Sequence, residues 1–128
     1  MELSARLADI LADVMPVDVE ADGALTVRHD GTVASLRTVS IADDIEMISL
    51  TQVLAWDLPI NADLRKRVAA AAQATMLGTV TLVEQTAKRG DVMLRYNFPG
   101  DGLGEAALRT LVLMVLAAGV DARRGLVD

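Results

Sequence analysis

The only histidine of the chain, His29, stands next to Asp30. A histidine and a carboxylate within hydrogen-bond reach can serve as a general base and the group that orients it. Adjacent strand residues point to opposite faces, however, and the Asp30-Gly31 dipeptide is typical of a tight hairpin turn. No serine or threonine is marked as a nucleophile, and the chain has no cysteine. We therefore predict that His29 is a solvated turn residue and that the chain has no catalytic residues.

Two further patterns resemble ligand-binding loops but depart from them at decisive positions. Asp18-x-Glu20-x-Asp22-Gly23 begins like a calcium-binding EF-hand loop, whose twelfth residue should be glutamate and is His29 here. Gly100-Asp-Gly102-Leu-Gly104 resembles a phosphate loop, but the third glycine of the dinucleotide pattern would fall on Glu105, whose charge repels phosphate. Neither pattern predicts a bound calcium ion or nucleotide.

Asp43, Asp44 and Glu46 form a local acidic cluster. A turn followed by one outward strand position accounts for these three residues. A site for a hard cation needs more converging oxygen ligands than this cluster offers. We therefore expect no metal ion and no cofactor.

Length and composition narrow the class of protein further. The 128 residues carry a net charge of −6, and 52% of them are hydrophobic but only 2% aromatic. Length predicts one domain, 1–128, with an aliphatic core. A nucleic-acid-binding protein would show a basic surface and stacking aromatic residues, which are missing here. The longest apolar run, Leu111 to Val120, is too short to span a bilayer, and the amino terminus does not resemble a signal peptide. We expect a soluble cytoplasmic protein.

The first half of the chain predicts a helix followed by an antiparallel meander. A helically spaced apolar stripe runs from Leu3 to Val14, and the helix should end before Pro16. A short extended segment at 17–20 comes next. Residues 24–29, 32–41 and 45–56 then alternate or are rich in β-forming residues, which predicts three strands. Val33, Val39 and Ile41 should share one face of the second strand.

The second half predicts a helix, a hairpin and a final helix. Asp57-Leu-Pro59 breaks the third strand, and Asn61 can cap a helix whose inner stripe is Leu64, Val68, Ala71 and Ala72 and continues through Thr75. Residues 79–85 and 91–98 predict paired strands, and a last helix runs from about 103 to 120. The order α-β-β-β-α-β-β-α favours an α+β fold with an antiparallel sheet.

The last helix is apolar nearly all round, which a helix that covers one sheet does not require. Leu113, Met114 and Ala117 lie outside its inner stripe, so we expect them to contact another protein or a second copy of the chain. Another element of the same chain could cover them instead. Trp56 is either a core residue or an interface anchor, and the core is favoured because most tryptophans are largely buried.

Several local features, taken in this order, resemble the type III secretion chaperone-like fold, and within it the YbjN family. They are the strand end Leu54-Ala-Trp-Asp-Leu-Pro59, the Asn61-capped helix, Gly78, the strand Leu94-Arg-Tyr-Asn-Phe98, the Gly100-Asp-Gly102 turn and the closing helix. The resemblance implies helices on a curved antiparallel sheet in a non-enzymatic, often dimeric protein that binds a polypeptide. It supplies no catalytic residues.

We therefore expect a non-catalytic protein-binding module, chaperone-like or regulatory, that acts as a homodimer and binds a polypeptide partner. Such modules bind by adding a strand to a sheet edge or by packing a helix in a groove. The alternatives are a small-ligand-sensing domain, which would need a buried polar cluster, and a structural subunit of a larger assembly.

Overall fold

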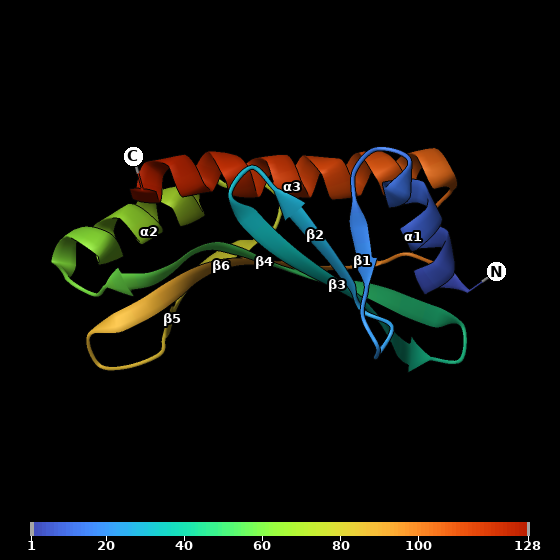
Figure 1. The fold of residues 1–128 in the computed structure, drawn as a ribbon, viewed down its shortest axis with the longest axis horizontal. Coiled ribbons are helices and arrows are strands. Elements are labelled where there is room, and N and C mark those ends of the chain that lie inside the picture. The colour runs from blue at the N-terminus through green and yellow to red at the C-terminus, as the bar shows by residue number, and fades with distance from the viewer. Residues whose placement is uncertain (1, 128) are drawn as a thin grey trace.

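The computed structural model describes residues 2–127, which form a six-stranded antiparallel sheet with three helices on one face (Figure 1). The strands lie in the order β1-β2-β3-β4-β6-β5. This arrangement confirms the predicted α+β class. Along the chain the elements are α1 (Leu3–Ala12), β1 (Val17–Val19), β2 (Leu25–His29), β3 (Thr32–Ala42), β4 (Ile45–Pro59), α2 (Ala62–Ala74), β5 (Thr79–Glu84), β6 (Arg89–Pro99) and α3 (Glu105–Val127).

The core lies between the sheet and the helices, and strand alternation decides which residues enter it. Val92, Leu94 and Phe98 of β6 are buried, whereas Arg95 and Asn97 are exposed. Val33, Val39 and Ile41 of β3 do share a face, but it is the face that the helices leave open. The buried residues of β3 are Thr32, Ala34 and Leu36.

Helix α1 is held by its apolar stripe. Leu3, Leu7, Ile10 and Leu11 are all buried, and the side chain of the N-cap residue makes no hydrogen bond to the helix. The helix ends at Ala12, so Val14, the last member of the predicted stripe, is 47% exposed. The expected short extended segment forms the edge strand β1, which pairs with β2. The first half of the chain therefore contains four strands, where the sequence predicted three.

Helix α2 begins as its sequence predicts. Asn61 adopts an extended backbone, and its side-chain oxygen accepts a hydrogen bond of 2.8 Å from the Leu64 N–H. The predicted inner stripe is partly wrong, because Leu64 and Val68 are buried but Ala72 is exposed. The helix ends at Ala74, and Gly78 follows in the turn to β5 with a φ of +91°.

Replacing Asn61 with alanine should lower the free energy of unfolding by about 1 kcal/mol, because one donor of the first helical turn loses its partner. Chemical denaturation measures this loss. Asn97→Ala removes an exposed asparagine that caps nothing and should change stability by less than about 0.5 kcal/mol. Equal losses in the two variants would contradict the capping role.

The two largest differences between predicted and observed boundaries have identifiable reasons. Strand β4 does not stop before Asp57 but continues to Pro59. The register of its pairing with β6 shifts after Val53 and again after Ala55, so the strand passes Asp57 without ending. Helix α3 continues past Val120 to Val127, since Leu126 packs into the core beside the start of α2.

Candidate functional site

Helix α3 lies along most of the length of the molecule above the sheet, with α1 and α2 on the same side of the sheet (Figure 1). Contacts with α1, α2, β3 and β4 explain why so much of it is apolar. Its buried residues are Leu108, Val112, Val115, Leu116, Gly119, Val120 and Leu126. Other elements of the same chain therefore cover more of α3 than the sequence suggested. The apolar surface of α3 that stays exposed is smaller than predicted.

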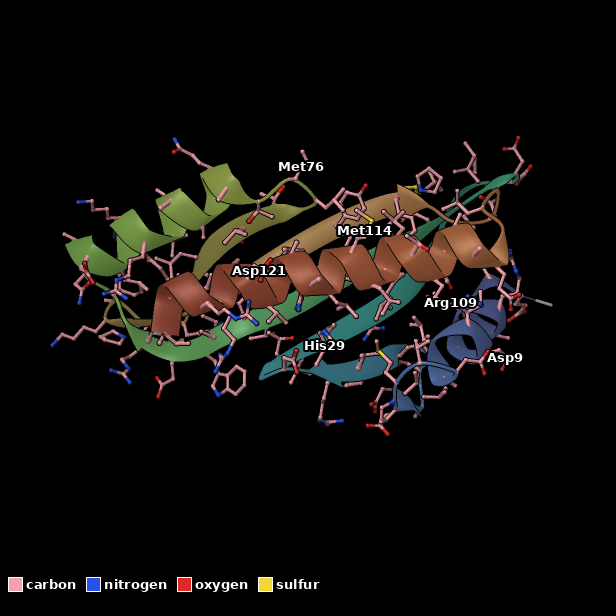
Figure 2. The ribbon with its side chains drawn as sticks, turned by 90° about the horizontal axis from the view of Figure 1, so that it is seen from above. Asp9, His29, Met76, Arg109, Met114 and Asp121 are labelled. Carbon is pink, nitrogen blue, oxygen red and sulfur yellow. The ribbon has the colours of Figure 1, made fainter. Side chains whose placement is uncertain are left out.

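The apolar residues of α3 that remain exposed form a short ridge on its outer side. Met114 is 54% exposed, Ala117 is exposed and Leu113 is half-buried; these three residues are called the α3 ridge. Met76, in the turn after α2, is 94% exposed and lies on the same helix-bearing side of the molecule as Met114 (Figure 2). The structure thus places three of the four predicted contact residues together.

A groove separates α2 from α3. Its volume is about 460 Å³, and Arg67 and Asp121 are the charged residues that line it. The other lining residues are small or apolar: Ala70, Ala71, Ala74, Thr75, Met76, Ala118, Ala122 and Gly125. Because alanine and glycine fill so little space, the two helices leave a trough between them that exposes apolar surface next to the α3 ridge.

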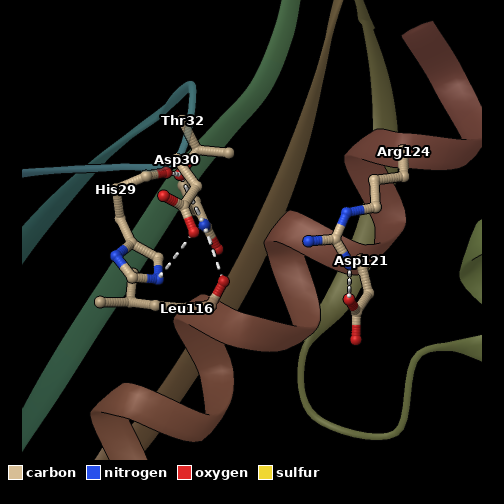
Figure 3. A network of polar contacts seen from close by, with 7 residues as sticks. His29, Asp30, Thr32, Leu116, Asp121 and Arg124 are labelled. Carbon is tan, nitrogen blue, oxygen red and sulfur yellow. Dashed lines mark hydrogen bonds and ion pairs between the residues drawn. The ribbon is translucent and has the colours of Figure 1, made fainter. Parts of the chain in front are cut away.

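A buried amide joins the sheet to α3 beneath this surface. The Gln52 side chain is fully buried, and its Nε2 donates to Thr32 Oγ1 at 2.9 Å and to the Leu116 carbonyl at 3.2 Å (Figure 3). Thr32 Oγ1 in turn donates to the His29 carbonyl at 2.6 Å. Gly119 leaves the space that the carboxamide oxygen of Gln52 occupies. This cluster fixes α3 over β3 and β4, and it was not predicted from the sequence.

Trp56 is 53% exposed, so the expectation that it belongs to the core is wrong. The first register shift in β4 places both Leu54 and Ala55 in the core, and strand alternation then directs Trp56 away from the helices. Trp56 therefore does not join the α3 ridge, and the four predicted contact residues divide between two surfaces.

Polar contacts hold the strand around Trp56 in place. Asp57 has a φ of +56°; its carboxylate accepts a hydrogen bond of 3.0 Å from Arg89 Nε, and its N–H donates to Asp91 Oδ1 at 2.9 Å. The Arg89 hydrogen bond and charge lower the pKa of Asp57 below its ordinary value of 3.8. An exposed tryptophan on a braced strand is a rigid contact point.

Trp56 is the only tryptophan, so its fluorescence reports on this brace. A lowered pKa in the folded state means that the ion pair is lost only as pH falls through that pKa, which lies below 3.8. We expect the emission to stay constant between about pH 7 and 5 and to change below that range. Arg89→Gln should raise the midpoint toward 3.8; a midpoint that does not move would exclude Arg89 as the cause.

The patterns first considered for chemistry do not assemble into a site in the described part of the chain. His29 Nε2 lies 3.9 Å from Asp30 Oδ2, beyond hydrogen-bond distance (Figure 3). Asp18 pairs with Arg28 at 2.7 Å and Asp22 with Arg37 at 2.8 Å, so both carboxylates already have partners. Within residues 2–127 no group of three or more acidic or histidine side chains is arranged to hold a metal ion.

The comparisons with known proteins concern the fold. No family model and no curated protein matches the chain. Among solved structures it is similar to the Yersinia pestis type III secretion chaperone SycH, crystallised in complex with a stable fragment of YscM2. The TM-score is 0.62 at 14% identity, over 98% of this chain and 99% of the SycH chain. The chain therefore has the fold of a type III secretion chaperone, as the resemblance implied.

None of the helices described within residues 2–127 is both long enough and apolar enough to cross a membrane.

Proposed function

We propose that the protein is a non-catalytic, chaperone-like or regulatory protein-binding module of the YbjN type, formed by one domain. It acts in the cytoplasm as a homodimer and binds a segment of a polypeptide partner. The observation that carries the proposal is the apolar surface formed by the α3 ridge, Met76 and the adjoining α2–α3 groove. SycH, which shares the fold, was crystallised with a protein fragment, and this supports a polypeptide as the ligand.

The chemistry of the surface fits a peptide better than a small polar ligand. The groove is lined mainly by alanine, and its two charged side chains already have partners, Arg67 with Asp63 at 3.0 Å and Asp121 with Arg124 at 2.9 Å. An apolar trough of this kind accommodates the side chains of an amphipathic helix. Exposed methionines at its border adapt to partners of different shape. Trp56, on its own surface, provides a second anchor for the partner.

Met114→Glu tests the proposal, because it places a charge on the α3 ridge at a half-exposed position that the fold tolerates. We expect the variant to fold with wild-type stability and to lose at least about tenfold in affinity for a polypeptide partner, the cost of a charge in an apolar contact. Ala87→Glu adds the same charge at the exposed β5–β6 turn and should bind normally.

Retention of every partner by Met114→Glu would exclude the α3 ridge as the binding surface. A saturable rise in melting temperature with a metabolite, abolished by a substitution in the groove, would favour the small-ligand alternative.

A further inference from the structure

Two of the exposed strand edges of the sheet are blocked. Strand β1 is only three residues long and carries Asp18. Strand β4 extends beyond the end of β3, but Arg123 Nη1 donates to the Leu54 carbonyl there at 2.6 Å, and Pro59 ends the strand. Short length, charge, proline and covering side chains are the devices that keep strand edges from pairing with other chains.

Strand β5, at the opposite edge of the sheet from β1, is longer than β1 and carries no unpaired charge. Thr79–Glu84 pairs with β6 in an unbroken register and contains no proline or lysine. Its one charged residue is Glu84, whose carboxylate is paired with Arg65 of α2 at 2.9 Å. A regular strand edge without blocking residues is a template for pairing with another strand.

Hairpin geometry identifies which backbone groups of β5 are free. Gln85 N–H donates to the Arg89 carbonyl across the β5–β6 turn, so Gln85 faces β6. Backbone direction alternates along an antiparallel strand, so Thr81 and Val83 also face β6. The N–H and C=O groups of Val80 and Leu82 must therefore point out from the edge of the sheet.

These observations point to a second copy of this chain as the occupant: we propose that two copies pair antiparallel through β5, centred on Thr81, and so join their sheets. In this register Val80 lies opposite Leu82 of the second copy and exchanges both backbone hydrogen bonds with it, and symmetry repeats the pair beyond the axis. Glu84 lies outside the pairing and keeps its contact with Arg65. No like charges meet, which is the condition for a self-complementary interface.

The surface above the edge also suits a second copy. A groove of about 430 Å³ runs between α2 and β5, and Val68, Ala69, Ala72, Val80 and Leu82 are among its lining residues. Val80 and Leu82 of the second copy lie on the helix side of the joined sheet, where this groove receives them. Ala69 and Ala72 are exposed on α2 and leave room above the strand, and Arg65, which also lines the groove, is held by Glu84 of its own copy.

The inference rests on the homodimer in the proposed function and names its surface. The test is light scattering on separated fractions of the whole chain. Wild type should have twice the chain mass. Thr81→Lys and Thr81→Glu should each have the chain mass, because two like charges meet at the axis. An equimolar mixture of the two variants should recover twice the chain mass. Asn97→Lys, on the same sheet face beyond the end of β5, should behave as wild type.

Circular dichroism shows whether the Thr81 variants are folded before their masses are compared. Folded Thr81→Lys and Thr81→Glu proteins that remain dimeric would overturn the inference while leaving the proposed homodimer intact. Loss of the dimer in Met114→Glu would then place the contact on the α3 ridge. A monomeric wild type would overturn both the inference and the homodimer, whereas polypeptide binding is decided separately by the affinity of Met114→Glu.

Discussion

Alanine at Gly119 should lower the free energy of unfolding by about 2–4 kcal/mol, although alanine is the better helix former. A Cβ at this position overlaps the carboxamide of Gln52, which is buried and cannot move into solvent. Either α3 lifts from the sheet, or Gln52 gives up its hydrogen bonds to Thr32 and Leu116. Thermal and urea denaturation measure the loss.

Gly125→Ala is the matched control, because it lies on the same helix and its added Cβ would meet nothing within 4 Å. It should be neutral or raise stability by up to about 1 kcal/mol through helix propensity. Gln52→Ala combined with Gly119→Ala should cost less than the sum of the single variants, since the overlap is gone. A strictly additive double variant would contradict the proposed overlap.

Leu7→Ala should cost about 2–5 kcal/mol, the usual loss when a fully buried leucine leaves a cavity. Leu7 is 1% exposed in a ten-residue helix whose N-cap side chain makes no capping hydrogen bond. Apolar packing, with one hydrogen bond of 2.8 Å from Arg6 to the Leu103 carbonyl, therefore holds α1 in place. A helix this short has little stability of its own. Denaturation followed by circular dichroism measures the loss.

Val14→Ala is the comparison for Leu7→Ala. Val14 continues the same apolar stripe in the sequence but lies beyond the end of α1 and is 47% exposed. Its replacement should change stability by no more than about 0.5 kcal/mol. Similar losses at the two positions would mean that α1 extends further than Ala12 and buries Val14.

Local signals account for the elements that the sequence predicts correctly. The Asn61 cap, the Asp30-Gly31 turn and the alternation of β6 each depend on residues close in the chain. The order of the strands in the sheet does not depend on residues close in the chain. Strands β4 and β5 are parallel, so the α2 crossover leaves a strand position between them, and β6 returns to fill it. No short-range pattern specifies that choice.

The site was harder to predict for the same reason. Gln52 interrupts the inward alternation of Leu50 and Leu54, which signals a buried polar residue, but its partners lie 20 and 64 residues away. The sequence favours the core for Trp56 because most tryptophans are largely buried, whereas the register shifts that expose it depend on pairing with β6. Whether Met114 is exposed depends on where α1 and α2 pack beside α3. The pattern of apolar residues within α3 does not predict those positions.

The most direct test of the proposed function is the native mass of the protein, purified under mild conditions from the cells that make it. The proposal predicts two copies of the chain with a bound polypeptide, and loss of that polypeptide but not of the second copy in Met114→Glu. A single chain that carries no polypeptide, or only the added mass of a small molecule, would contradict it.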